Sequence, residues 1–312
     1  MQMENVSRVG FGGCSVKNKK EVLDRLCSLT EGKKVVVDDG WGYSGELVNT
    51  KFLGDYISTH ERDKFIIIEK LPLFDGLYQK LYNKSLYNCS DKELEQMIID
   101  VFNKQLEALK TDYIDCYLLH AIFDFQFHPD FDIDKDIALY KRITPILLKL
   151  KKEGKVKALG FSCHITYSRL LEFLTEVDPN NEIFSIAEVS YNTLNDKGFD
   201  PKNPSAFVYM LCVNVWPAIG EKGIKLLKSK GYDIIDMMPH EGGRLLEIST
   251  APDFISWNDR FIMSNNNISV VLEGTSNPEN INKMLIAAGE IENPNPIPDM
   301  RVLGVGLGHC SE

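Results

Sequence analysis

The sequence predicts a single α/β domain that folds as an eight-stranded (β/α)8 TIM barrel. Short apolar, β-branched segments alternate with segments of helical period along the chain, which is typical of parallel strands joined by right-handed helical crossovers. Eight such units in a row favour a closed barrel over an open doubly wound sheet. The first loop has three glycines but no G-x-G-x-x-G, so the dinucleotide fingerprint of an open Rossmann sheet is missing.

The expected strands are rich in Val and Ile and are bounded by polar or glycine-containing segments. In chain order they cover 8–13, 33–38, 63–70, 112–120, 156–162, 183–190, 232–238 and 268–274. The amphipathic segments between them predict helices over 19–29, 93–110, 138–154, 168–177, 221–231 and 278–290. Asn277 is expected to cap the last helix, with Pro278 at its first position.

We expect one domain over residues 1–312, with an extended tail over 291–312. The aromatic-rich segments 71–90 and 121–136 are longer than a barrel needs, and 191–220 is a third long connection. Long loops of this kind on a rigid scaffold usually form lids or substrate walls.

The composition excludes several classes of function. A net charge of −10 and a pI near 5.2 oppose binding to nucleic acid or to an anionic membrane surface. The seven scattered cysteines contain no C-x-x-C pair, so we expect no disulfide framework and no metal or cluster site built on cysteine. Without a signal-peptide pattern or an apolar stretch approaching 18 residues, the chain reads as a soluble cytoplasmic protein.

Polar residues close the expected strands, at the C-terminal face where barrel enzymes build their active sites. They are Asp38, Lys70, His120 and Ser162 on the second to fifth strands, with Tyr43 in the loop after Asp38 and Glu188 near the end of the sixth. A lysine and a histidine next to buried backbone are partly desolvated and need partners.

Four of these residues have the side chains that a proton-transfer centre needs. A tyrosine titrates near pH 10 and donates poorly at neutral pH, but a neighbouring ammonium favours the phenolate and lowers that pKa. An aspartate keeps the lysine charged, and a histidine can orient a substrate oxygen or assist the transfer. We therefore expect Asp38, Tyr43, Lys70 and His120 to act together.

At these residues the sequence resembles the aldo-keto reductases: D-x-x-x-x-Y joins Asp38 to Tyr43, Lys70 ends a strand, and YIDCYLLH ends in His120. The resemblance continues through GKVKALGFSCH (154–164), EVSYN (188–192), MMPHEGGRL (237–245) and VVLEGTSNPENINKM (270–284), and so covers roughly the whole barrel. DYIDCYLLHA, GFS-x-H and M-x-P-x-x-GG-R-L look closest to a bacterial branch in which some members carry a C-terminal iron–sulfur ferredoxin module. Since no cysteine cluster follows, we expect that module to be absent.

The resemblance implies hydride transfer from NADPH or NADH to an aldehyde or ketone, which becomes an alcohol. Tyr43 would be the general acid, Lys70 would tune its pKa, Asp38 would orient Lys70, and His120 would position the carbonyl. The residues implied at the cofactor are Ser162, Cys163 and Glu188 at the nicotinamide, and Gly274, Thr275, Ser276 and Asn280 near the adenosine phosphate at a helix N-terminus.

Several of these positions depart from the family pattern. Cys163 stands where asparagine is usual, and Glu188 replaces a glutamine, so it can accept a hydrogen bond from the carboxamide but cannot donate one. Gly274 and Asn280 replace basic residues familiar from NADP-specific members, and Lys283 is the nearest cation. The choice between NADPH and NADH therefore stays open.

Simpler roles are expected for other polar residues. Asp39 is predicted to serve a turn or a cap, and Cys163 to be a small buried filler. His164 either faces the cofactor or satisfies a loop carbonyl. For His240 and Arg244 we favour a solvated loop over contact with the substrate mouth or the cofactor pyrophosphate.

Two other functions are compatible with the sequence. The changes at the cofactor positions motivate a catalytically silent nucleotide-binding barrel that acts as a regulatory or scaffold subunit. A barrel lyase or aldolase would use Lys70 as a Schiff-base amine, which the nearby Asp38 disfavours. The acidic segment 123–136 disfavours a multiply anionic substrate and fits a neutral or cationic one, such as a sugar or an amino-carbonyl metabolite.

Overall fold

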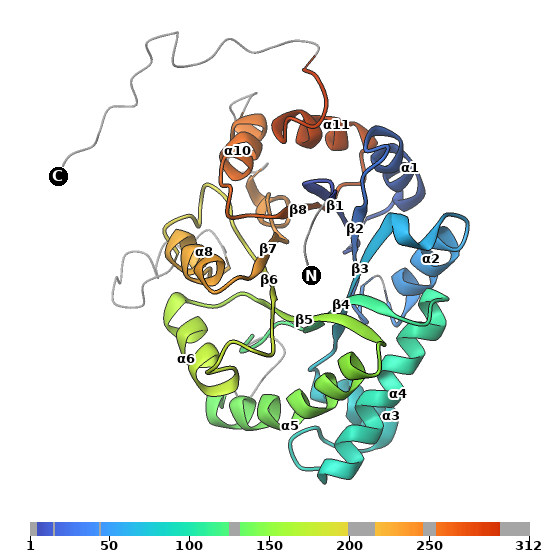
Figure 1. Cartoon of the computed structure of the whole chain (residues 1–312), viewed down its shortest axis with the longest axis vertical. Helices are drawn as coiled ribbons and strands as arrows, with labels where there is room; N and C mark the ends of the chain where they lie inside the picture. The colour runs from blue at the N-terminus through green and yellow to red at the C-terminus, as the bar shows by residue number, and fades with distance from the viewer. Residues whose placement is uncertain are drawn as a thin grey trace, which may run out of the picture.

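The structure is a computed structural model that describes residues 5–14, 16–43, 45–124, 132–198, 216–245 and 254–293. Eight parallel strands close into a barrel in the order β1 to β8, and helices surround it (Figure 1). The predicted (β/α)8 fold is therefore confirmed. The acidic residues 125–131 and most of the predicted tail lie outside the described residues.

The eight strands coincide with the eight predicted segments to within a few residues. They are β1 Val9–Gly12, β2 Val35–Asp38, β3 Phe65–Leu71, β4 Ile114–Leu119, β5 Val156–Cys163, β6 Ile186–Val189, β7 Asp233–Asp236 and β8 Val270–Glu273.

The helices include all six that the sequence predicts. These are α1 Lys19–Leu29, α4 Asp91–Leu109, α5 Ile133–Lys152, α6 Tyr167–Val177, α8 Gly220–Ser229 and α11 Pro278–Ala287. The structure adds α2 Val48–Ile57, α3 Asp75–Tyr82 and α10 Phe254–Met263, with short 3-10 turns η1 Arg62–Lys64 and η2 Glu241–Gly243. The cap of α11 is as predicted, since the Asn277 side chain accepts from the Glu279 amide at 3.1 Å.

Two of the unpredicted helices bury polar or small residues, which hides their apolar period. In α2, Asn49 and Thr50 are fully buried, and Gly54 packs so tightly that a Cβ there would lie 2.1 Å from the Ala108 carbonyl of α4. In α10, Asn258 and Asp259 face the interior.

Strand alternation explains how the site residues reach the barrel interior. The apolar interior is lined by Val36, Ile66, Ile68, Cys116, Leu118, Ala158, Ile186, Ile235, Val270 and Leu272. Successive side chains on a strand point to opposite faces, so the residue two positions later also points inward. Asp38, Lys70, His120 and Glu188 each follow an interior residue by two, and therefore form the next inward layer at the C-terminal rim.

Among the described residues, no helix has both the length and the apolar character needed to span a membrane.

Candidate active site

Lys70 lies at the centre of the inward layer. Its ammonium donates to Asp38 Oδ1 and to the backbone carbonyl of Asp39, at 3.0 Å in the second case. It also forms an ion pair with Glu188 Oε1 at 3.3 Å. The side chains of Lys70, Asp38 and Glu188 are at most 5% exposed, so this is a buried cluster that joins β2, β3 and β6. The contact between Glu188 and Lys70 was not predicted.

The charges in this cluster are unequal, because two carboxyl groups compete for one ammonium. Burial opposes the charged ammonium, but the charges of Asp38 and Glu188 outweigh it and raise the pKa of Lys70 well above its usual value. Burial and the charge of Glu188 raise the pKa of Asp38, against the effect of Lys70. Lys70 therefore stays charged at neutral pH.

Tyr43 sits beside this cluster in a tight turn after β2, where its amide donates to the Gly40 carbonyl at 2.9 Å. The Lys70 ammonium lies 5.1 Å from the centroid of its ring. Tyr43 and His120 meet edge to face with ring centroids 6.0 Å apart. A Cβ on Gly40 would lie 3.1 Å from Tyr43 Cε1 and 3.4 Å from His120 Cε1, so glycine leaves room for both rings.

The pKa of Tyr43 differs from the sequence-based expectation. The ammonium of Lys70 does lower it, as predicted, but burial raises it more, and the charges of Asp38 and Glu188 add to that rise. The net pKa lies well above the usual value, so the predicted lowering is outweighed. The phenol therefore keeps its proton.

His120 is held in place by the neighbouring strands. Its amide donates to the Leu71 carbonyl at 3.2 Å, and the next amide, of Ala121, donates to Ser162 Oγ at 2.8 Å. Burial lowers the pKa of His120 well below its usual value, and the charge of Lys70 lowers it further. His120 is therefore a neutral imidazole, which can donate or accept a hydrogen bond.

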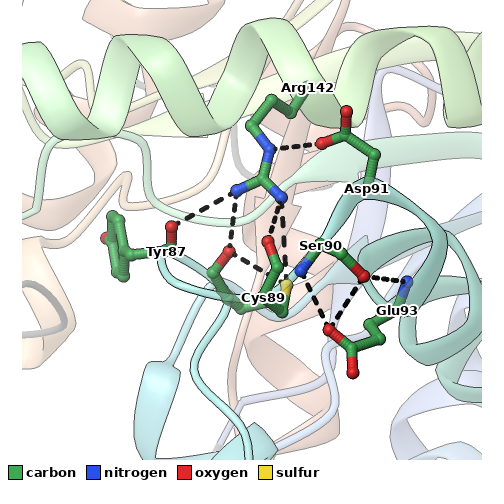
Figure 2. Close-up of polar contacts among 7 residues, drawn as sticks. Tyr87, Cys89, Ser90, Asp91, Glu93 and Arg142 are labelled. Atoms are coloured by element: carbon green, nitrogen blue, oxygen red, sulfur yellow. Dashed lines mark hydrogen bonds and ion pairs between the residues drawn. The ribbon is translucent and has the colours of Figure 1, made fainter.

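The segment after β3, predicted as a substrate wall, reaches this site through Phe74, whose ring centroid lies 5.2 Å from that of His120. Figure 2 shows how its far end is fixed: Arg142 of α5 donates to the Cys89 carbonyl at 2.6 Å and to Asp91 at 2.7 Å. This end of the segment is therefore tied to the helical layer.

The other predicted cofactor residues form a turn between β8 and α11. Strand register pairs Phe11 with Glu273 and Gly12 with Asp38, so this turn lies at the level of Asp38, two strands away. A Cβ on Gly12 would lie 3.4 Å from the amide nitrogen of Gly274, so the two loops approach closely.

Hydrogen bonds within the turn order its side chains. Thr275 Oγ1 accepts from the Asn277 amide and from the Asn280 side chain, each at 3.0 Å. Ser276 Oγ accepts from the Lys17 amide at 3.0 Å. The structure thus brings Gly274, Thr275, Ser276 and Asn280 together, as the sequence predicts, but as a group separate from Ser162 and Glu188.

The backbone N–H groups at the start of α11 suit the phosphate of a nicotinamide nucleotide. The turn leads into the N-terminus of α11, where backbone N–H groups and the helix dipole favour a phosphate, and Gly274 is exposed.

His164 and Cys163 follow Ser162 at the end of β5. His164, beside Trp216 with ring centroids 4.8 Å apart, has a buried Nδ1 without a hydrogen-bond partner. Burial lowers the pKa of His164 to about 4. Cys163 is 2% exposed and buried among apolar side chains, which agrees with its predicted role as a filler.

A second charged cluster lies on the outer face of the rim, between β7, β8 and α10. His240 Nε2 lies 2.7 Å from Asp259 Oδ1, and its Nδ1 lies 3.7 Å from Glu273 Oε2. The His240 side chain is only 16% exposed, so its predicted place in a solvated loop is wrong. Within the described part of the chain, no group of three or more His, Cys, Asp or Glu side chains is suited to hold a metal ion.

Two groups of this outer cluster have pKa values shifted upward, to about 7 and about 9. Burial opposes the charged imidazole, but the hydrogen bond to Asp259 and the charge of Glu273 raise the pKa of His240 to about 9. Burial raises the pKa of Glu273 to about 7. The sequence carried no signal for this cluster, because Asp259 comes from a helix that the pattern did not reveal.

Asp39 is also placed differently from the prediction. It is fully buried, and its Oδ1 accepts from the Asn49 side chain at 2.7 Å. Strand alternation gives the reason, since the residue after the inward-facing Asp38 must face the helical layer.

Comparison with known proteins identifies relatives of this fold. Residues 10–251 match the model of the aldo/keto reductase family. Aldo-keto reductase AKR11C1 from Bacillus halodurans, in its holo form, is 18% identical with a TM-score of 0.60, over 90% of this chain and 86% of that one. An aldo/keto reductase from Klebsiella pneumoniae in complex with NADP and acetate is 14% identical with a TM-score of 0.59, over 91% and 86%.

A putative aldo-keto reductase from Pseudomonas aeruginosa is 20% identical with a TM-score of 0.58, over 91% of this chain and 90% of that one. No curated protein matches the sequence. At these identities the structural neighbours establish the fold. The comparisons contain no support for the narrower branch with a ferredoxin module.

Proposed function

This chain belongs to the aldo/keto reductase family, and on that basis we propose that it reduces an aldehyde or ketone to an alcohol with NADPH or NADH. The observation that carries the proposal is the buried Lys70 ammonium, which is held by Asp38 and lies 5.1 Å from the centroid of the Tyr43 ring. His120 completes the group by contacting the same tyrosine.

In this proposal the bound nucleotide supplies the hydride, and the protein supplies the proton. Tyr43 holds that proton on its phenol and donates it to the carbonyl oxygen as negative charge develops there. The charge of Lys70 stabilises the phenolate that remains, and Asp38 keeps Lys70 charged. The neutral imidazole of His120 orients the carbonyl oxygen by donating a hydrogen bond.

Two groups of residues would hold the nucleotide. Ser162 and Glu188 would bind the carboxamide of the nicotinamide, with Cys163 packed beneath them, and the turn of Gly274, Thr275, Ser276 and Asn280 would bind the adenosine phosphate. Residues 274–280 include no Lys or Arg, which lessens selectivity for the additional phosphate of NADP. The Klebsiella pneumoniae neighbour, which was crystallised with NADP, supports a nucleotide of this class.

The charge state of Lys70 weighs against the Schiff-base alternative. A Schiff base forms from a neutral amine, whereas the carboxylates around Lys70 raise its pKa. We further propose that residues 1–312 form one domain and that the substrate is a small neutral or cationic carbonyl compound, such as a sugar or an amino-carbonyl metabolite.

The test has two steps. NADPH and NADH are first titrated by fluorescence, and oxidation of the bound nucleotide is then followed with a reactive aldehyde and a panel of neutral, cationic and phosphorylated carbonyl compounds. We expect binding of at least one nucleotide and faster turnover of the uncharged or cationic compounds. Binding without any turnover would favour the silent barrel, and failure to bind either nucleotide would contradict the proposal.

A further inference from the structure

Two buried acidic residues lie directly behind the Lys70 cluster. Asp39 follows Asp38, and Glu69 precedes Lys70, so both face the helical layer rather than the barrel interior. The register of β2 and β3 pairs Asp38 with Ile68, which places Asp39 beside Glu69. Both side chains are fully buried.

Each of these carboxyl groups uses one oxygen for amide donors. Asp39 Oδ1 accepts from Asn49 at 2.7 Å, while Glu69 Oε1 accepts from Gln105 at 2.8 Å and from the Lys70 amide at 3.0 Å. The other oxygens, Asp39 Oδ2 and Glu69 Oε2, are buried, and no amide, hydroxyl or basic group of the described residues donates to them.

The two carboxyl groups lie side by side on paired strands, near enough for a hydrogen bond between them to raise the pKa of Glu69. The oxygens left for this bond are Asp39 Oδ2 and Glu69 Oε2. Because an ionised carboxylate only accepts, one of the two groups must carry a proton for the bond to exist.

The nearest cations do not neutralise both groups, because Lys70 pairs with Asp38 and Glu188, and Lys19 acts on Asp39 alone. In the described residues, no lysine or arginine forms an ion pair with Asp39 or Glu69. The titratable groups that face the pair are Asp38 and Lys70 on the strands, Lys19 from α1, and Tyr117 of β4 acting through Gln105. Lys70 directs its ammonium to Asp38 and Glu188 on the inner face.

We infer that Asp39 and Glu69 share one proton, and that this pair positions Lys70. The Asp39 carbonyl accepts from the Lys70 ammonium at 3.0 Å, and Glu69 accepts from the Lys70 amide, so the pair holds the backbone on both sides of that lysine. Burial and the charge of Asp39 raise the pKa of Glu69 well above 4.5, which identifies Glu69 as the protonated partner. The sharing of one proton by Asp39 and Glu69 does not depend on the proposed reaction. The catalytic importance of positioning Lys70 rests on the proposed function.

This inference predicts that folding takes up one proton at Glu69. In the unfolded chain Glu69 ionises near pH 4.5, and in the folded protein it stays neutral to a higher pH. Between these two values the folding equilibrium constant falls by up to tenfold per pH unit as the pH rises.

Glu69→Gln tests for this proton by urea unfolding at a series of pH values from pH 5 upward. The Gln amide can donate to Asp39 and still accept from Gln105, so the bonds persist without a titrating proton. We expect the ratio of the wild-type folding constant to that of Glu69→Gln to fall by up to tenfold per pH unit until the folded-state pKa of Glu69 is reached. The exposed control Glu31→Gln should follow wild type.

Asp39→Asn provides a second test that does not depend on how well Glu69→Gln folds. The amide that this substitution introduces would donate to Glu69 and leave it ionised, so the variant should also lack the proton uptake. If both variants keep the pH dependence of wild type, the proton is not shared and the inference is wrong.

The positioning role needs a separate readout. We expect Glu69→Ala to move the alkaline limb of the kcat profile to higher pH, because Tyr43 loses the nearby charge of Lys70, and Glu69→Gln to restore it. An unmoved limb in Glu69→Ala would overturn the positioning role. If neither nucleotide supports turnover, the proposed reaction fails, and the urea experiments still decide the proton count.

Discussion

The inner and outer faces of the barrel rim each hold a buried cation between two carboxyl groups. On the inner face the cation is Lys70, between Asp38 and Glu188, and on the outer face it is His240, between Asp259 and Glu273. The raised pKa of Lys70 makes the inner charge permanent, whereas the pKa of His240 near 9 makes the outer charge titratable.

This difference suggests different roles for the two clusters: the inner one in the proposed reaction and the outer one in stability. In the proposed reaction, the permanent positive charge of Lys70 stabilises the phenolate that Tyr43 leaves as the general acid. The outer cluster lies between strands and α10, where its first effect is on stability. Three substitutions test whether the two clusters differ in this way.

Lys70→Met has the largest expected effect. It leaves Asp38 and Glu188 buried without a cation, which should cost about 3–5 kcal/mol of unfolding free energy. The control Lys80→Met, at the exposed ion pair with Glu46, should cost less than about 1 kcal/mol. Urea unfolding measures both, and equal losses would mean that Lys70 does not hold the inner cluster together.

His240→Gln tests the outer cluster through its pH dependence. The pKa of His240 is raised from 6.5 to about 9, so its contribution is fully present below pH 6.5 and is lost as the pH rises to 9. Relative to the variant, wild type should lose about 2–3 kcal/mol over this window. Thermal unfolding at several pH values measures the loss. Parallel curves for wild type and His240→Gln would contradict a charged histidine, and the exposed control His60→Gln should follow wild type.

Glu188→Gln should have the smallest effect on stability, within about 1 kcal/mol, because it removes one of two carboxyl groups that compete for one ammonium. Its effect on titration is more informative. The charge of Glu188 raises the pKa of Tyr43, so the variant should move the alkaline limb of turnover to lower pH. A limb that moves upward or stays in place would show that the charge of Glu188 does not act on Tyr43. The exposed control Glu182→Gln should leave the limb unchanged.

The inner cluster was largely predictable and the outer one was not. Asp38, Lys70 and His120 each end an apolar run, and such runs mark the strands whose ends meet at one rim. The contact of Glu188 with Lys70 could not be predicted, because the two side chains meet across the barrel interior from β3 and β6, which are three strands apart. The outer cluster depends on Asp259, which lies in an unpredicted helix.

The misplacement of Asp39 has a similar physical origin. Two adjacent carboxylates after an apolar run resemble a turn in sequence. In the structure the chain continues in register past Asp38, so Asp38 faces the barrel interior and Asp39 faces the helical layer. Its partners Asn49 and Glu69 come from α2 and β3, so their contacts appear only when the layers pack. The positions of the strands could therefore be predicted from the local sequence, but the contacts between the strands and the surrounding helices could not.

The rate of hydride transfer in Tyr43→Phe, measured in a single turnover with the nucleotide bound, tests the proposed chemistry most directly. We predict unchanged nucleotide affinity and a rate reduced at least ~100-fold, because the phenol no longer donates its proton. The control Tyr113→Phe, just before β4 at the end of the barrel opposite the rim, should match wild type. A Tyr43→Phe variant that transfers hydride at the wild-type rate would contradict the assignment of Tyr43 as the general acid.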